Sequence, residues 1–203
     1  MSRVVVIGSG GHAKVVIATA RAAGFTVAGV VDDDPARWGQ HVLGVSITGP
    51  AAPVLDDPSA FAVLAIGVNR ARQRRASGAR CQLATVVHPS AIIDPSVAIG
   101  PGSVVFAGAV IQPDAVLGAH VIVNTGASVD HDCVLGDFVH IAPGVRLAGN
   151  VTLQAGALLG VGAVAIPGIR VGAWATVGAG AAIVRDLPAE CVAAGVPARP
   201  RPR

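Results

Sequence analysis

From Val87 onward, every sixth position of the chain carries an aliphatic side chain. Sixteen of the seventeen positions in this series hold Val, Ile or Leu, and the series keeps its register as far as Ile183. A small or apolar residue stands four positions after each of them. A period of six is neither the helical period nor a simple strand alternation, so each unit is expected to be a short strand followed by a turn.

Prolines and glycines mark where these turns fall. Six prolines stand two positions after an aliphatic residue, and glycines gather next to them, as in the run from Ile99 to Gly102. Three such units per coil predict a triangular parallel β-solenoid of between five and six coils, with the aliphatic side chains pointing inward. We place this domain at residues 87–188 and a C-terminal tail at residues 189–203.

The first 80 residues follow a different pattern. An apolar strand at residues 3–7 leads into the sequence G-S-G-G-H and then into a helical pattern that closes at Gly24. A second strand follows at residues 25–31. This order predicts an α/β, Rossmann-like βαβ domain at residues 1–80.

Polar residues follow the strands of this domain. Asp32 and Asp33 come directly after the second strand, and Gly67 and Asn69 come after a third strand at residues 61–66. The carboxyl ends of parallel strands meet at one edge of a sheet, so these residues are expected on one rim. The two aspartates are suited to accept hydrogen bonds from a sugar hydroxyl or a base N–H group.

The turn after the first strand nominally satisfies the dinucleotide-binding fingerprint, through Gly8, Gly10 and Ala13. An NAD-dependent dehydrogenase is therefore an alternative, but about 80 residues hold only half of a Rossmann domain and leave no substrate domain. The turn still offers the backbone N–H groups of Gly10, Gly11 and His12 at a helix N-terminus, where an anionic or polar ligand binds well.

Composition narrows the classes of protein further. The chain is 52% apolar, 13% charged and 3% aromatic, with a net charge of +3. This balance excludes a disordered chain, and it lacks the stacking aromatics that a nucleic-acid-binding protein interleaves with basic residues. Gly, Pro or Asp interrupts every apolar stretch before it is long enough to span a bilayer, and the start does not read as a signal peptide. We expect a soluble, cytoplasmic protein with reduced cysteines, in which the basic cluster at residues 70–80 is a solvated helix face or a site for an anionic ligand.

One stretch of the repeat is rich in polar side chains that a solenoid does not need. Its members are Asn124, Asp130, His131, Asp132, Asp137 and His140. A histidine beside a carboxylate is typical of a general base, because the carboxylate fixes the ring tautomer and stabilises the imidazolium. His131 and Asp132 are the candidate pair. Neighbouring side chains on a strand point in opposite directions, so Asp130 or Asp137 is an alternative partner unless the corner turns the backbone.

Several motifs together resemble one family. The sequence contains G-S-G-G-H-A, then D-D-D, then A-I-G-V-N-R-A-R, then a solenoid with the pattern N-x6-H-D-x7-H and a G-V-P-A ending. This order resembles the sialic-acid O-acetyltransferase-like family of hexapeptide-repeat sugar acetyltransferases, which includes N-acetyltransferases of nucleotide-linked 4-amino-4,6-dideoxy sugars. The resemblance implies a left-handed parallel β-helix as the second domain.

The resemblance also implies roles for residues. His131 would be the general base that takes a proton from the sugar amine as it attacks the thioester of acetyl-CoA, and Asp132 would orient it. Asn124 would contact the substrate near the reacting nitrogen. The nucleotide sugar would be received by a set of residues in the first domain: Gly10, Gly11, His12, Asp32, Asp33, Gly67 and Asn69.

On the acetyl-CoA side, the resemblance implies a contact from His140 and an oxyanion-stabilising backbone N–H from Gly149. The pantetheine would pass Val161 and Ala179. Acetyl-CoA would be a co-substrate, with no tightly bound cofactor and no metal, and the chain would form a homotrimer with each site between two solenoids.

Other functions stay open at this point. O-acetylation of a sialic-acid-type sugar is the nearest alternative. A metal site of the kind found in γ-class carbonic anhydrases would need His120, His131 and His140 to converge, although their spacings do not repeat the coil. A solenoid that serves only as an assembly scaffold would not explain the polar stretch. Cys133 occupies an inward-facing small position, so we expect a core thiol and no acyl-enzyme.

Overall fold

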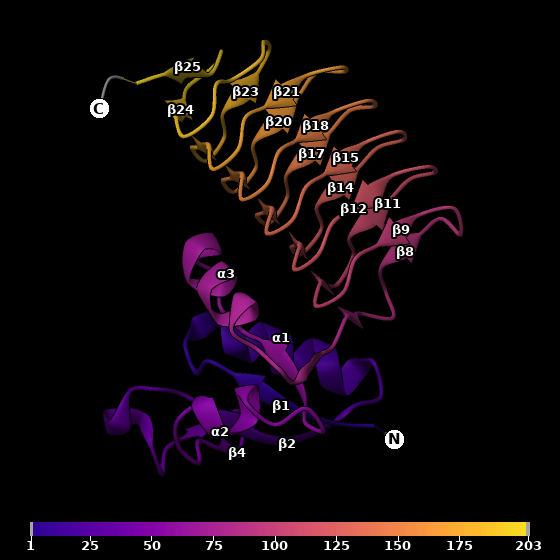
Figure 1. The fold of residues 1–203 in the computed structure, drawn as a ribbon. Helices are drawn as coiled ribbons and strands as arrows, with labels where there is room; N and C mark the ends of the chain where they lie inside the picture. Colours follow the sequence, from indigo (N-terminus) through magenta and orange to yellow (C-terminus); the bar gives the residue numbers. More distant parts are fainter. Residues whose placement is uncertain (1, 202–203) are drawn as a thin grey trace. The chain divides into compact units, whose positions relative to one another are not determined.

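The structure, a computed structural model, describes residues 2–201, so residues 202 and 203 of the expected tail lie outside the described residues. The chain divides into an amino-terminal unit that ends at Pro89 and a solenoid unit that begins at Ser90 (Figure 1). Among the described residues, no helix has the length and apolarity that a membrane crossing requires.

The amino-terminal unit contains a four-stranded parallel sheet in the order β2-β1-β5-β6. Its strands are β1 (Arg3–Ile7), β2 (Thr26–Val31), β5 (Phe61–Leu64) and β6 (Gln82–Leu83). Its other elements are α1 (Gly11–Ala22), η1 (Pro35–Arg37), β3 (His41–Val42), β4 (Val45–Ser46), α2 (Ala52–Leu55), α3 (Asn69–Ser77) and β7 (Val86–Val87). The predicted Rossmann-like βαβ unit is confirmed, and the strand and helix bounds differ from the expected ones by a few residues.

Helix α1 packs through a stripe of apolar residues. Ala13, Val16, Ile17 and Ala20 are fully buried, and their spacing of three and four places them on one face of a helix. At the carboxyl edge of the sheet, Gly8 donates to the carbonyl oxygen of Val31. The ends of β1, β2 and β5 therefore meet at one rim, as expected.

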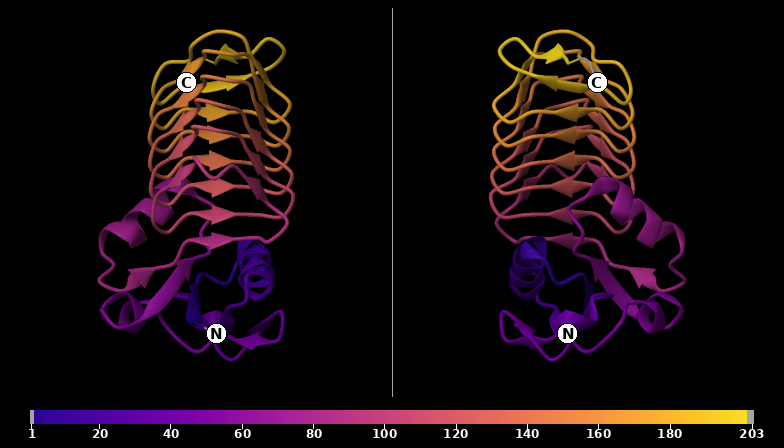
Figure 2. Two further views of the ribbon diagram at one scale, coloured as in Figure 1. Left: turned by 90° about the vertical axis from the view of Figure 1, so that its right-hand side faces the viewer. Right: turned by 90° about the vertical axis from the view of Figure 1, so that its left-hand side faces the viewer.

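The solenoid unit contains seventeen short parallel strands, β8 to β24, that stack on three faces (Figure 2). The first face holds β8 (Ile92–Ile93), β11 (Val110–Ile111), β14 (Ser128–Val129), β17 (Arg146–Leu147), β20 (Val164–Ala165) and β23 (Ala182–Ile183). The second holds β9 (Ala98–Ile99), β12 (Val116–Leu117), β15 (Val134–Leu135), β18 (Thr152–Leu153) and β21 (Arg170–Val171). The third holds β10 (Val104–Val105), β13 (Ile122–Val123), β16 (His140–Ile141), β19 (Leu158–Leu159), β22 (Thr176–Val177) and β24 (Val192–Ala194), with β25 (Arg199–Pro200) antiparallel to β24.

Each strand pairs with the strand one coil later, as Val129 does with Leu147, and the second residue of each pair points into a narrow interior. Leu135, Ile141, Leu153 and Leu159 are almost completely buried there. The predicted six-residue repeat and its left-handed β-helix are confirmed.

The corners depend on one backbone conformation. Within residues 102–180, every sixth residue has a positive φ. Three corner columns result, and we name them by their side chains. The aromatic column holds Gly102, His120, Phe138, Gly156 and Trp174; the glycine column holds Gly108, Gly126, Gly144, Gly162 and Gly180; the carboxylate column holds Asp114, Asp132, Asn150 and Gly168.

The expected register is wrong at its last position. Leu187 stands four positions after Ile183, in the small-residue series that the repeat predicts, but it pairs with Val171, an aliphatic position of the preceding coil. The carboxylate of Asp186 accepts the backbone N–H of Arg170 at 2.8 Å, a separation of 16 residues. The last coil is two residues shorter than the others, since Val171 pairs with Leu187 and Val177 with Ala193, each 16 residues on, so β24 enters the third face early.

Two glycines of the corners are expected to respond differently to alanine. Gly162→Ala places a side chain in open space at φ 68° and should lower the free energy of unfolding by about 1–2 kcal/mol, the cost of left-handed backbone. Gly156→Ala places Cβ 2.2 Å from Cε3 of Trp174, so it should cost a further 1–3 kcal/mol, roughly, for overpacking. Urea unfolding of the two variants measures the difference; equal losses would contradict the packing of Trp174 on Gly156.

Candidate active site

His131 lies at the corner between the first and second faces, directly after β14. Asp132, the next residue, has φ 58°, and this left-handed turn brings its Oδ2 to 2.7 Å from Nδ1 of His131. Asp130 accepts the backbone N–H of His131 at 2.8 Å. Asp137 accepts the N–H of Ala119 at 2.8 Å and so braces a different corner. Of the three candidate carboxylates, Asp132 is the one that contacts the ring.

The contact with Asp132 decides which ring nitrogen is available for chemistry. A carboxylate only accepts hydrogen bonds, so Nδ1 of His131 donates and Nε2 carries the lone pair of the neutral ring. The hydrogen bond that Nδ1 donates to Asp132 raises the pKa of His131 above its ordinary value of 6.5, and the charges of Asp130 and Asp132 add to this effect against a smaller opposing effect of burial. The arrangement is that of an oriented general base.

The ring of His131 lies against Gly149 of the next coil. A Cβ added to Gly149 would lie 2.5 Å from both Cε1 and Nε2 of the imidazole, so only glycine leaves room for this placement. The N–H at this position of the repeat is not part of the strand ladder, since Pro167 occupies the same position one coil later and Pro113 two coils earlier. The N–H of Gly149 is therefore not required by the strand ladder, and Gly149 itself lies against the ring of the candidate base.

Asn124 and His140 form a second pair, at a different place. Nδ2 of Asn124 lies 3.4 Å from Nε2 of His140, at the corner between the third and first faces. Val161 and Ala179 stand at the same corner one coil apart, and Val161 is 56% exposed. This is the corner that carries the glycine column.

The predicted solenoid residues thus divide into two sets on different corners, with the first face between them. His131, Asp132 and Gly149 make one set. Asn124, His140, Val161 and Ala179 make the other, although the sequence placed the polar stretch in a single cluster. His120 lies at the third corner and stacks on Phe138, with ring centroids 5.0 Å apart. Within residues 2–201, no group of three or more His, Cys, Asp or Glu side chains is arranged to hold a metal ion.

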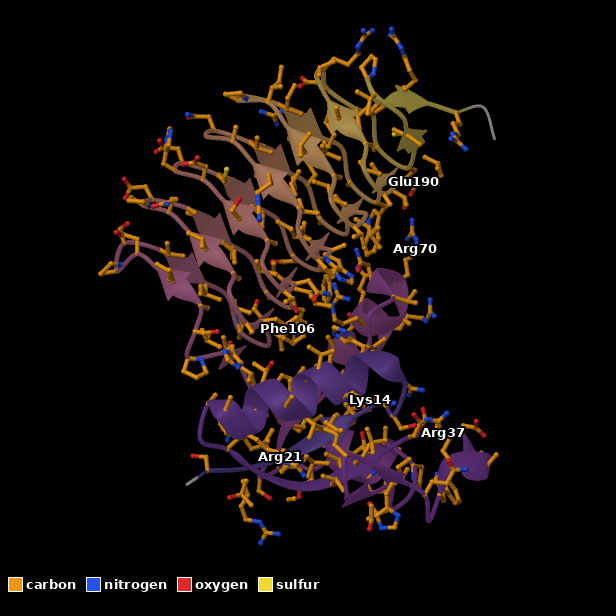
Figure 3. The ribbon with its side chains drawn as sticks, turned by 180° about the vertical axis from the view of Figure 1, so that it is seen from behind. Lys14, Arg21, Arg37, Arg70, Phe106 and Glu190 are labelled. Carbon is orange, nitrogen blue, oxygen red and sulfur yellow. The ribbon has the colours of Figure 1, made fainter. Side chains whose placement is uncertain are left out.

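The amino-terminal unit has a cavity of about 470 Å³ at the rim of its sheet. Its lining residues are Ile7, Gly8, Val31, Asp32, Asp33, Ala51, Ile66, Ala71, Arg74 and Arg75. Of the predicted substrate residues, Asp32 and Asp33 line the cavity, and Gly10, Gly11, His12, Gly67 and Asn69 do not. Arg74 and Arg75 of the basic cluster line this cavity, so its interpretation as a site for an anionic ligand stays a prediction beside that of a solvated helix face. Arg70 is exposed on the same helix (Figure 3).

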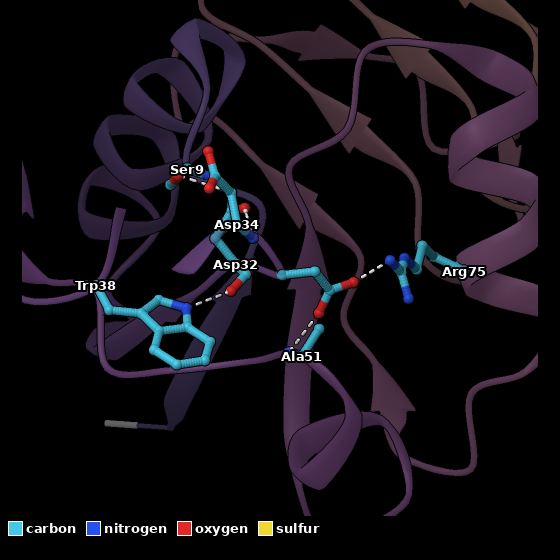
Figure 4. A network of polar contacts seen from close by, with 7 residues as sticks. Ser9, Asp32, Asp34, Trp38, Ala51 and Arg75 are labelled. Atoms are coloured by element: carbon cyan, nitrogen blue, oxygen red, sulfur yellow. Dashed lines mark hydrogen bonds and ion pairs between the residues drawn. The ribbon is translucent and has the colours of Figure 1, made fainter. Parts of the chain in front are cut away.

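The two aspartates of this cavity are held differently (Figure 4). Asp32 accepts from the backbone N–H and the hydroxyl of Ser9, at 2.7 and 2.6 Å, and from the N–H of Asp34 at 3.0 Å. Burial alone would raise the pKa of Asp32, but these hydrogen bonds and the charge of Arg37 lower it overall. Asp32 therefore joins the strand-end loops to each other. Ser9 was not singled out from the sequence, although it stands between the glycines of the turn.

His12 and Arg72 are interior groups of this unit. Arg72 is 1% exposed and donates to the carbonyl oxygens of Ile66 and Gly67 and to the buried side chain of Asn69. Burial, together with the charge of Arg72, lowers the pKa of His12 to about 4, so the ring is neutral at pH 7. These contacts hold the loop after β5 in place, and neither His12 nor Arg72 lines the cavity.

Comparison with known proteins gives the family. Residues 3–78 match the family described as the PglD N-terminal domain. The acetyltransferase domain of PglB from Neisseria gonorrhoeae, solved with acetyl coenzyme A, is 42% identical, covers 98% of either chain and superimposes with a TM-score of 0.91. The chain belongs to the family of hexapeptide-repeat sugar acetyltransferases. The predicted family, fold and enzyme class, an acyltransferase, are confirmed.

Two further relatives are informative. PerB from Caulobacter crescentus, solved with CoA and GDP-perosamine, is 46% identical over 100% of this chain and 98% of its own, with a TM-score of 0.90. The UDP-N-acetylbacillosamine N-acetyltransferase of Bacillus subtilis is 39% identical over 116 residues. The chain spans about half the length of that curated relative, 52%.

The placement of His131 against Gly149 has a measurable consequence. In Gly149→Ala, the added methyl group should push the ring away from Asp132, so the pKa of His131 should fall toward its ordinary value. An NMR titration of the His131 ring measures this. Val161→Ala, an exposed change at the equivalent position of another corner, should leave the titration unchanged, and an unaltered pKa in Gly149→Ala would refute the contact.

Proposed function

We propose that the chain transfers the acetyl group of acetyl-CoA to the amino group of a nucleotide-linked 4-amino-4,6-dideoxy sugar. The observation that carries this proposal is the His131–Asp132 pair, with the imidazole ring packed against Gly149. A base and an oxyanion donor at one corner are the groups that acyl transfer between a thioester and an amine requires. The relatives solved with acetyl coenzyme A and with GDP-perosamine support the same choice of substrates.

In the proposed reaction, the neutral sugar amine attacks the thioester carbonyl carbon, and a C–N bond forms. Nε2 of His131 takes the proton that the nitrogen loses, and Asp132 stabilises the imidazolium. The N–H of Gly149 donates to the oxyanion of the tetrahedral intermediate. Collapse of the intermediate breaks the C–S bond, and the proton on His131 passes to the leaving sulfur, so the base is regenerated.

The glycine column supports placing the acyl donor at the corner between the third and first faces. The other two columns carry His, Phe, Trp, Asp and Asn at the left-handed position, so that conformation does not by itself demand glycine. At Gly126, Gly144, Gly162 and Gly180, an added Cβ would meet nothing within 4 Å. A bare edge beside Asn124 and His140 suits the approach of a long thin ligand, and the pantetheine arm of acetyl-CoA is such a ligand.

Because the two sets of residues occupy different corners, we propose that each active site forms between two copies of the chain in a homotrimer. One copy supplies His131, Asp132 and Gly149, and a neighbouring copy supplies Asn124 and His140 with the glycine column. The nucleotide would be held in the amino-terminal unit, where Asp32, Asp33 and two arginines line the cavity. Holding both substrates in place supplies the proximity that speeds acyl transfer.

The test is acetyl-CoA-dependent thiol release with a panel of nucleotide-linked 4-amino sugars and their 4-hydroxyl analogues. His131→Ala should lower kcat by about 100-fold to 10,000-fold, the usual contribution of a general base. The base must be deprotonated to act, so kcat/KM should decrease as the pH is lowered. Because the pKa of His131 is raised, the midpoint of this decrease should lie above pH 6.5. Asp132→Asn weakens the hydrogen bond that contributes most to the raised pKa and also removes the charge of Asp132. The fall in kcat/KM should therefore move to lower pH, and its maximal value should be smaller.

Asp94 provides the control, because this half-buried carboxylate accepts hydrogen bonds from the nearby Ser96 and lies outside the two sets of candidate residues; Asp94→Asn should leave the profile unchanged. Thiol release from none of the amino sugars would contradict the proposal. Release with the hydroxyl analogues alone would replace it with O-acetylation.

A further inference from the structure

Asp33 is a carboxylate that is both fixed and accessible from the cavity. Its Oδ1 accepts the backbone N–H of Ala51 at 2.9 Å, and its Oδ2 pairs with the guanidinium of Arg75 (Figure 4). Its side chain remains 39% exposed. The neighbouring Asp32 already accepts three hydrogen bonds, two from Ser9 and one from Asp34. Asp33 is therefore the carboxylate of this cavity with capacity for a ligand.

The partner of Asp33 indicates which ligand suits it. A carboxylate pairs best with two adjacent N–H donors, as in a guanidinium. The N1–H and N2–H₂ groups of guanine are the same fragment, two nitrogen donors on one carbon. Uracil and thymine present one N–H between two carbonyl oxygens, which a carboxylate repels, and adenine presents one amino group beside an acceptor nitrogen. Guanine is the common base that matches Asp33 with two donors.

The rest of the cavity agrees with a base at this place. Ile7, Val31 and Ile66 supply apolar walls for the faces of a ring, and the volume of about 470 Å³ is that of a small-molecule site. Arg74 lies on the same lining as Arg75. The Asp33–Arg75 pair is largely solvent-exposed, with 39% and 44% of the two side chains accessible, so exchanging the guanidinium for another donor costs little.

We infer that Asp33 reads the base of the nucleotide-linked sugar and selects guanine. This inference rests on the proposed function, because it assumes that the amino-terminal cavity holds the nucleotide. When the guanine edge takes the place of the Arg75 guanidinium on Asp33, Arg75 joins Arg74 as a partner for the phosphates.

Calorimetric binding of nucleoside diphosphates to the full chain tests the inference. GDP and IDP differ only in the 2-amino group, so GDP should bind at least about tenfold more tightly than IDP, because the lost donor faced a charged acceptor. GDP should also bind more tightly than UDP and ADP. In Asp33→Asn, the affinity for GDP should fall at least about tenfold, and GDP and IDP should come within about twofold of each other.

Two variants serve as controls. Arg75→Gln should retain the preference for GDP over IDP, because Arg75 does not contact the base in the complex. Asp57→Asn changes an exposed carboxylate that bonds Ser59 and should alter no affinity. Thermal unfolding of each variant shows whether the fold is retained.

Equal binding of GDP and IDP by the unmodified chain, or a preference that survives Asp33→Asn, would overturn the inference. Tighter binding of UDP, with acetyl transfer to a UDP-linked amino sugar, would overturn it and leave the proposed function standing. If none of the nucleotides bound and no nucleotide-linked sugar were acetylated, both would be overturned.

Discussion

The solenoid depends on a left-handed residue at every sixth position between residues 102 and 180, because each such residue turns the chain from one face to the next. Glycine adopts this conformation without strain, and another residue pays roughly 1–2 kcal/mol for it. Side chains at these positions therefore indicate a compensating contact. His120 and Phe138 stack on each other, and Asp132 binds the ring of His131. The strained position of Asp132 is the one that makes the candidate base.

The coil geometry also determines which candidate residues share a corner. Residues one coil apart are 18 positions apart, and His131 and Gly149 have this separation. The position one coil after Asn124 is residue 142, and His140 stands two residues before it. His140 and Asn124 are therefore 16 positions apart and lie close together. His131 and Asn124 are seven positions apart, so they lie at different corners. An active site that uses both sets must draw on more than one solenoid.

Much of the fold could be predicted from the sequence, because each six-residue unit repeats the same local choice of an inward aliphatic residue and a turn. The 18-residue length of a coil also predicts which side chains share a corner, and it divides the polar stretch between two corners. Other contacts had no signal of this kind. Arg75 pairs with Asp33, which is 42 positions away in the sequence, and this contact depends on the direction in which α3 leaves the sheet. The shortened last coil contains a hydrogen bond from the backbone N–H of Arg170 to the side chain of Asp186, which the six-residue pattern does not signal.

The most direct measurement is the activity of mixed oligomers made from two inactive variants, His131→Ala and Asn124→Ala. Each variant alone should release little thiol from acetyl-CoA. If every site takes His131 from one copy and Asn124 from another, random mixing leaves both residues intact in about a quarter of the sites, so roughly a quarter of the unmodified activity should return. No recovery on co-expression, with hetero-oligomers shown to form, would mean that both residues act within one chain and would contradict the account.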